Sequence, residues 1–238
     1  MWRIRSLLWI LRERQPDMGP GILEVLFQYW PIFLKGLLGT LKYAFIAVSL
    51  GSILGALVAM LSLSPNKAIH AVASVYVNVL RGTPLLVQMY IAYFFLPMVL
   101  PALNQVSKEV YVLLALILNS SAYVSEIVRS GIQSVDKGQK EAALSLGLSS
   151  SQCMTRIILP QAVKNILPAL ANEYIAMIKE TSLAGTFMLY ELMYTRTILA
   201  NKFLSWQPLF IIAGIYLICT LGLSFLVRLM ERRLKVSD

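Results

Sequence analysis

The chain has 238 residues, of which 58% are hydrophobic and only 14% are charged, and its mean hydropathy is +0.69. A soluble domain of this size carries about 25% charged residues, so the composition indicates an integral membrane protein. The net charge of +9 is typical of cytoplasmic anchoring and contact with anionic membrane lipid, because Lys and Arg gather in cytoplasmic loops. The sequence shows no basic soluble face of the kind that binds nucleic acid.

The first segment, residues 1–32, is predicted to lie at the membrane interface. Four arginines flank a short apolar run at residues 7–11, which is too short to span a bilayer. No small-residue cleavage site follows the run, so a cleaved signal peptide is not indicated. Asp, Gly and Pro residues at 17–21 then end the segment.

The remainder is predicted to form an all-α membrane domain of about five transmembrane helices over residues 33–233, followed by a cytoplasmic tail at 234–238. A transmembrane helix needs ~20 apolar residues. The second apolar stretch is longer than that, and Arg-Gly-Thr-Pro at 81–84 interrupts it, so it is either one long tilted helix or two helices joined there. A short helix is expected over Tyr190–Thr197. The predicted spans are residues 37–63, 71–100, 110–128, 157–178 and 203–227.

The orientation follows from the Lys and Arg residues of the short loops. Basic residues gather in the loop 129–156 and again after residue 227, which places both regions in the cytoplasm. Five spans then place the N-terminus outside, although the four arginines near it argue for the opposite side.

The loop between the third and fourth spans has the sequence of a helical hairpin. Residues 139–146 favour a helix, and Gly147 suits the left-handed position that ends one. Ser149 and Gln152 have the spacing of a capping box that opens a second helix. Pro160 is expected to break that second helix near its end, because it lacks a backbone donor.

The same loop has a spaced pattern formed by Glu141, Ala142, Ala143, Gly147, Ile157, Leu159 and Pro160. This pattern resembles the EAA loop of bacterial ABC importer permeases, and the resemblance assigns to these residues the coupling to an ATPase. Further motifs in order extend the resemblance over residues 33–233 to the polar amino-acid branch, which includes histidine, arginine, glutamine and cystine permeases. These motifs are RGTPLLVQ at 81–88, AYVSE at 122–126, GI at 131–132, GQ at 138–139, PQA at 160–162, LP at 167–168, NE at 172–173 and KETSL at 179–183.

The resemblance implies the type I ABC importer permease fold in the bacterial cytoplasmic (inner) membrane. Its expected partners are an ATP-binding subunit, a second permease subunit (the same chain or a sister chain), an external substrate-binding protein, an amino-acid substrate and membrane lipid. The chain is expected to bind no cofactor itself, since ATP and Mg belong to the ATPase and the sequence contains no G-x-x-x-x-G-K-[ST] phosphate-binding loop.

Polar residues within the spans are the candidates for substrate binding. Asn119, Tyr123 and Glu126 are spaced by four and three residues, so they share one helix face. A carboxylate at membrane depth usually faces a bundle interior, a partner or a wet cavity. Glu126 therefore either attracts the ammonium group of the substrate or forms a structural salt bridge with Arg81 or Arg129.

Other candidates follow the break at 81–84 and the fourth span. Arg81 can bind a carboxylate or brace the cytoplasmic end, and the hydroxyls of the 179–182 segment can hold substrate or cap a helix. Glu173 is interpreted as a helix-packing residue. The predicted substrate-binding residues, some of them placed by the resemblance, are Gln88, Asn119, Tyr123, Glu126, Thr181 and Ser182.

The sequence therefore predicts a membrane-spanning permease subunit of an ATP-driven amino-acid importer. Two alternatives remain: a secondary transporter driven by an ion gradient, with Glu126 as a proton site, and a non-transporting scaffold half of a heterodimeric permease. The odd span count and the lack of a repeat weigh against the first. Cys153, Cys219 and His70 form no metal or redox cluster, and no nucleophile–base set is present, so no enzyme is expected.

Overall fold

The structure, a computed structural model, describes residues 21–200 and 206–235. The arginines and the apolar run of the predicted interfacial segment lie outside these described residues. Within them the chain is helical and contains no strand, as the apolar sequence predicts. Three helices are long and apolar enough to cross a membrane, and a fourth crossing results if one bent helix pair counts as a span.

The first crossing helix, α2, runs from Ile22 to Ser62 and begins well before the predicted residue 37. The backbone of Tyr29 is not helical, and Pro31 follows it inside the helix. Proline removes a helix hydrogen bond and clashes with the preceding turn. The added N-terminal stretch therefore lies across a kink from the rest of α2.

The second apolar stretch forms two helices, as one of the two predicted alternatives had it. Helix α3 spans Lys67–Gly82, and Asn66 caps it by accepting hydrogen bonds from two backbone N–H groups. Helix α4 (Leu85–Tyr90) continues through a π-helical turn, Ile91–Phe95, into α5 (Leu96–Val99). The chain bends by 104° between α3 and the α4–α5 segment. Thr83 and Pro84 form the bend, where the extended backbone of Thr83 ends α3.

Long helices make up the remainder of the bundle. They are α6 (Lys108–Gln133), α9 (Leu159–Glu180) and α11 (Gln207–Lys235). The shorter elements are 3-10 turns at Pro101–Gln105 and Thr181–Phe187, and the helices α7 (Lys137–Ser145), α8 (Ser150–Cys153) and α10 (Tyr194–Ala200). Helix α9 carries Lys164, Glu173, Lys179 and Glu180, yet it packs against α2, α6 and α11 as part of the same bundle.

Helices α2 and α6 form the most extensive helix contact because small residues let their backbones approach. A Cβ atom on Gly51 would lie 2.9 Å from the Ser120 side chain, and one on Gly55 would lie 2.7 Å from the carbonyl oxygen of Ser121. Small residues are the usual basis of close helix packing in membranes. Gly51 and Gly55 therefore lie on the surface of α2 that contacts α6.

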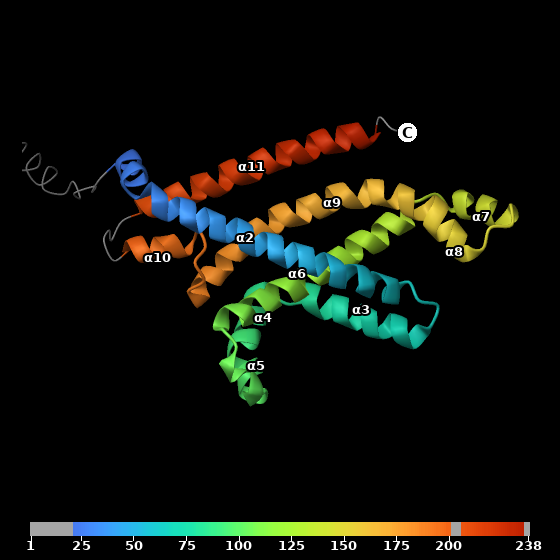
Figure 1. Ribbon diagram of the computed structural model, residues 1–238, viewed down its shortest axis with the longest axis horizontal. Helices are drawn as coiled ribbons and strands as arrows, with labels where there is room; N and C mark the ends of the chain where they lie inside the picture. The colour runs from blue at the N-terminus through green and yellow to red at the C-terminus, as the bar shows by residue number, and fades with distance from the viewer. Residues whose placement is uncertain (1–20, 201–205, 236–238) are drawn as a thin grey trace, which may run out of the picture.

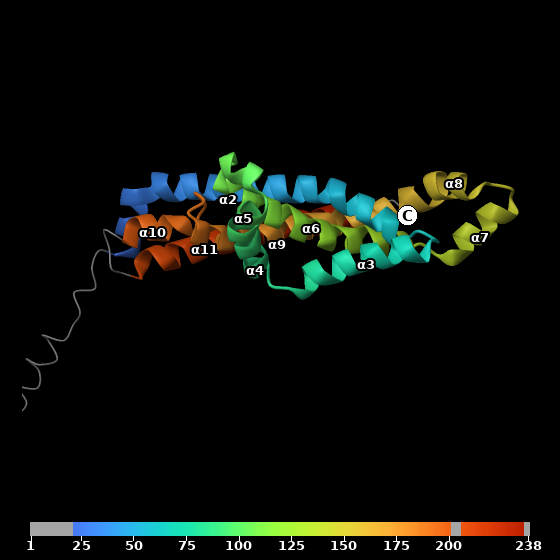
Figure 2. The same cartoon turned by 90° about the horizontal axis from the view of Figure 1, so that it is seen from below.

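The bundle has two distinct ends, which both views show (Figures 1 and 2). Helices α7 and α8 project beyond one of them, called here the loop end, and α10 lies at the other, called the far end. Helices α2 and α11 both start at the far end and run towards the loop end. Residue 22 and the basic 129–156 loop therefore lie at opposite ends, as the predicted orientation requires.

The connection after α9 folds back onto α2 and α11 at a buried carboxylate. Glu191 is fully buried, and its oxygens accept hydrogen bonds from the backbone N–H groups of Met193 (2.7 Å) and Tyr194 (2.6 Å) and from the hydroxyl of Tyr216 (3.1 Å). The Leu192 N–H donates to Thr40 of α2. Burial raises the pKa of Glu191 to about 7.

Candidate functional site: a capped hairpin and two polar cavities

The projecting hairpin confirms the helix, turn and cap that its sequence predicts. Helix α7 ends in a Schellman motif, in which Gly147 has a φ of +86° and the Leu148 N–H donates to the Ala143 carbonyl (3.1 Å). Ser149 and Gln152 form the capping box: the Ser149 N–H donates to the Gln152 side chain (2.9 Å), and the Gln152 N–H donates to the Ser149 hydroxyl (3.3 Å).

The residues with the EAA spacing divide between the interior and the surface of the hairpin. Ala143 is buried, with Cys153 and Ile158, in a small core of the hairpin. Ile157 packs against this core, Leu159 is half-buried, and Pro160 is exposed. Glu141, Ala142 and Gly147 are exposed as well, and so is Leu146 at the tip, with 81% of its surface accessible. The sequence analysis did not single out Leu146. An apolar residue directly before the glycine that ends the helix could have indicated an exposed contact residue.

The expectation that Pro160 breaks the second helix is wrong. The chain continues helically from α8 through a π-helical turn, Met154–Ile158, into α9, and Pro160 lies within the first turn of α9. The wider π-helical turn directly before Pro160 changes the local hydrogen-bond pattern, and the helix continues through the proline. The hairpin is therefore joined to α9 without an interruption.

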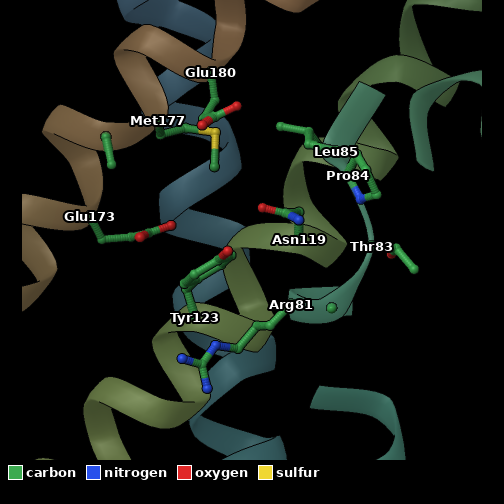
Figure 3. Close-up of a pocket in the computed structure, with 11 residues that line it drawn as sticks. Arg81, Thr83, Pro84, Leu85, Asn119, Tyr123, Glu173, Met177 and Glu180 are labelled. Atoms are coloured by element: carbon green, nitrogen blue, oxygen red, sulfur yellow. The ribbon is translucent and has the colours of Figure 1, made fainter. Parts of the chain in front are cut away.

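A polar cavity of about 440 Å³, called here the central cavity, lies among the α3–α4 bend, α6 and α9 (Figure 3). Asn119 and Tyr123 project into it from α6, and Glu173 projects into it from α9. One Glu173 oxygen accepts a hydrogen bond from the Ser120 hydroxyl (3.0 Å), and within the described residues no cation pairs with this carboxylate. The lining residues are Arg81, Gly82, Thr83, Pro84, Leu85, Asn119, Tyr123, Glu173, Ala176, Met177 and Glu180.

Gln88 stabilises the wall of this cavity rather than lining it. Its amide nitrogen donates to the Leu80 carbonyl (2.7 Å) and the Thr83 hydroxyl (2.9 Å), and its oxygen accepts from the Asn119 amide (3.2 Å). These bonds join the end of α3, the bend and α6. Gln88 therefore does not line the cavity itself, but its hydrogen bond to Asn119 orients that side chain in the cavity.

A second cavity of about 450 Å³, called here the inner cavity, lies next to the first, and its wall includes the last turns of α6. Glu126 lines it, and two arginines hold that carboxylate. Arg129 donates to both of its oxygens (2.8 and 2.9 Å), and Arg81 lies 3.1 Å away. Both predicted salt-bridge partners are therefore present. The lining residues are Arg81, Tyr123, Glu126, Ile127, Ser130, Gly131, Ser134, Asn165 and Ala169.

Thr181 and Ser182 lie away from both cavities. The Thr181 hydroxyl is buried and donates to the Ile178 carbonyl (2.7 Å), and the Ser182 hydroxyl donates to the Lys179 carbonyl (2.6 Å). Both side chains satisfy the last carbonyls of α9. Of the six predicted substrate residues, the structure brings Asn119 and Tyr123 into the central cavity together.

Two carboxylates of the central cavity were not predicted as substrate residues. Glu173 was interpreted as a packing residue and Glu180 was named only as part of the KETSL motif, yet both line the cavity. Their spacing of seven residues places them on one face of α9. That spacing was the available signal.

A helical membrane bundle that contains open polar cavities and carries a capped hairpin at one end has the architecture of a membrane transport subunit. Residues 51–236 match the family described as "Binding-protein-dependent transport system inner membrane component". The chain is 40% identical to the arginine transport system permease protein ArtQ of Bacillus subtilis over 211 residues, which are 87% of this chain and 94% of that protein. It is 40% identical to a putative glutamine transport system permease protein of Rickettsia bellii over 220 residues, 90% of this chain and 99% of that protein.

Solved structures agree with this match. The chain is similar to a subunit in a crystal structure of an amino acid ABC transporter with histidines, with a TM-score of 0.85, 43% identity and coverage of 91% of this chain and 100% of that one. A subunit of the MetNI methionine ABC transporter has the same fold, with a TM-score of 0.75 at 15% identity and coverage of 87% and 98%. The chain belongs to the binding-protein-dependent inner membrane permease family. It is a transport subunit, and in this family a partner ATPase hydrolyses the ATP.

Proposed function

We propose that this chain forms the substrate path of an ATP-driven amino-acid importer in a bacterial inner membrane. The observation that carries the proposal is the Glu173 carboxylate in the central cavity, which pairs with no cation among the described residues. An uncompensated carboxylate at membrane depth is costly unless a cation joins it. The ammonium group of an amino acid is such a cation. The relatives named for arginine and glutamine transport support this substrate class.

The cavity has the size and chemistry for a small zwitterion. Its volume of about 440 Å³ lies in the range of small-molecule sites. Glu173 and Glu180 supply negative charge on the α9 side, and the Asn119 amide supplies polar contacts on the α6 side. We place the ammonium group at Glu173, because this carboxylate already has one oxygen oriented by Ser120.

The hairpin α7–α8 is the part that receives the motion of an ATPase subunit. Glu141, Ala142 and Leu146 form an exposed face for docking, and the Schellman turn and capping box hold that face rigid. The unbroken path from α8 into α9 carries a displacement of the hairpin to Glu173 on the same helix.

The complete importer contains further subunits. ATP and Mg bind to a separate ATPase subunit, and an external binding protein delivers the amino acid. A second permease subunit, either another copy of this chain or a sister chain, completes the path. The doubly paired Glu126 makes a poor proton carrier, so a gradient-driven mechanism gains no support from it.

The test is uptake of radiolabelled arginine and glutamine by the complete transporter in proteoliposomes. Glu173→Gln keeps an acceptor for Ser120 but removes the charge that binds the ammonium group. A hydrogen bond to a charged group contributes about 1.5–3 kcal/mol, so uptake at low substrate concentration should fall tenfold to a hundredfold. Glu231→Gln on α11, outside both cavities, is the control and should leave uptake unchanged. Uptake by Glu173→Gln at the wild-type rate would refute the site. Wild-type uptake driven by a gradient without ATPase would refute the mechanism.

A further inference from the structure

The central and inner cavities share a wall. Arg81 and Tyr123 line both of them, and Figure 3 shows these two side chains next to each other at one edge of the central cavity. The inner cavity lies nearer the loop end, where its wall includes Ser134 and Asn165, which are joined by a hydrogen bond of 2.9 Å. A substrate that moves from the central cavity into the inner cavity along this shared wall therefore passes Arg81 and Tyr123.

An ion pair closes that wall by joining two helices. Arg81 comes from the end of α3, and its guanidinium carbon lies 5.3 Å from the ring centroid of Tyr123 on α6. The same guanidinium lies 3.1 Å from Glu126, one turn further along α6. Arg81 is thus held by a ring face and a carboxylate of the neighbouring helix, directly between the two cavities.

The two ion pairs of Glu126 differ in what they connect. Arg129 lies on the same helix and binds Glu126 through two hydrogen bonds, while also donating to Gln133 (2.6 Å). Arg81 belongs to a different helix and makes a single contact with one Glu126 oxygen. When α3 and α6 move apart, the Arg129 pair stays intact and the Arg81 pair separates. Glu126 then remains compensated by Arg129, so the separation leaves no isolated carboxylate.

We infer that Arg81 and Glu126 form the inner barrier of the transport path, and that the carboxylate of the substrate opens it by replacing Glu126 at Arg81. This inference rests on the proposed function, which supplies an amino acid bound through its ammonium group at Glu173. A guanidinium binds any carboxylate with the same fork geometry. The Arg81 and Glu126 side chains are 39% and 27% exposed, so solvent reaches the pair and the exchange of partners needs no full desolvation.

Arg81 can fill both of the roles that the sequence leaves open for it. While the central cavity is empty, Arg81 braces α3 against α6 through Glu126. Once an amino acid occupies the cavity, Arg81 binds its carboxylate and leaves α6. The short turn before α3 and the bend after it are the two points at which α3 can swing. The barrier therefore opens for a substrate that carries a carboxylate.

The first test measures access to the central cavity from the cytoplasmic side. Ala176→Cys places a thiol in the central cavity, and Ser130→Cys places one in the inner cavity, both in the complete transporter with Cys219→Ala. A membrane-impermeant methanethiosulfonate reagent is added to inside-out vesicles, and modification of the permease is followed over time. Ser130→Cys should react quickly. Ala176→Cys should react slowly, and at least tenfold faster after Glu126→Gln or Arg81→Gln.

Glu109→Gln provides a matched control, because it removes an ion pair with Lys42 at the other end of the same helix α6. It should leave the labelling of Ala176→Cys unchanged. Two barrier variants are used because they remove opposite partners of one pair, so a folding defect in one does not decide the result. Equal labelling rates in the wild type and both variants would overturn the barrier.

The second test measures whether the substrate carboxylate binds Arg81. The binding affinity of arginine is compared with that of argininamide, which lacks the free carboxylate, and the affinity of glutamine is compared with that of its α-amide. The wild type should prefer the acids. Glu126→Gln removes the competing carboxylate and should widen that preference at least threefold, whereas Arg81→Gln should abolish it. Preference that survives Arg81→Gln would overturn the exchange. Failure of the wild type to bind any of the four compounds would instead overturn the proposed substrate class, while the labelling test would still decide the barrier.

Discussion

Substitutions at Gly147 test the role of the hairpin turn, because they change only the energy of its backbone conformation. Its φ is +86°, and a Cβ atom added there would meet nothing within 4 Å. A substitution therefore creates no collision and costs only the left-handed backbone conformation, which is about 1–2 kcal/mol for an ordinary L-residue. Asn adopts this conformation more readily, and a β-branched residue adopts it least readily. The expected order of cost is Gly147→Asn, then Gly147→Ala, then Gly147→Val.

This conformational free-energy cost acts on a hairpin that has only a small hydrophobic core. The hairpin core consists of Ala143, Cys153 and Ile158 with a few half-buried neighbours. A cost of one to two kcal/mol reduces the population of a conformation by a factor of about 5 to 30. We expect Gly147→Ala to reduce the uptake per ATP hydrolysed by a factor in this range. The reduction should be larger for Gly147→Val and smaller for Gly147→Asn.

The assay measures amino-acid uptake and phosphate release together in proteoliposomes that contain the complete transporter. Gly214→Ala on α11 is the control, because its Cβ also meets nothing within 4 Å and its φ is not positive. Subunit assembly is checked by size-exclusion chromatography. Equal uptake per ATP in the three variants would contradict a role of the left-handed turn, because a surface effect would then explain any loss.

Two further predictions concern stability. A Cβ atom added by Gly55→Ala would lie 2.7 Å from the Ser121 carbonyl oxygen, and the helices must move until this distance is at least 3.4 Å. The substitution should therefore destabilise the bundle by about 1–3 kcal/mol. Gly214→Ala meets nothing within 4 Å and should not lower the stability, and thermal unfolding in detergent compares the two variants. The raised pKa of Glu191 means that the native protein keeps a proton that the unfolded chain releases. Unfolding free energy should therefore fall as pH rises from about 4.5 to about 7, by up to about 1.4 kcal/mol per pH unit, and then level off. Glu191→Gln should flatten this dependence, and an unchanged slope would contradict the assignment.

Local signals in the sequence were sufficient for the hairpin and for the bend. The left-handed glycine, the Ser149–Gln152 box and the Pro84 break each act within a few residues of the chain, where propensity and geometry decide the structure. The Pro160 error arose from a local signal too. Proline alone predicts a break, but the sequence did not reveal the π-helical turn that precedes Pro160 and lets the helix continue through it.

The cavities depend on contacts that no local pattern encodes. Arg81 meets Glu126 and Gln88 meets Asn119 only after α3, α4 and α6 have packed together. For the same reason the sequence left the role of Glu126 open between substrate and salt bridge. The hydroxyls at 181 and 182 looked equally suited to binding and to capping, and only the fold shows that they bond to their own helix.

The π-helical turn at Met154–Ile158 sets the direction in which the hairpin points around the axis of α9. Such a turn holds one residue more than an α-helical turn, and each residue of an α-helix advances by about 100°. Removing one residue there would restore regular register and swing α7 and α8 by about that angle, while the cavity-lining part of α9 stayed in place. A single extra residue thus fixes the angle between the proposed docking face of the hairpin and the helix that carries Glu173.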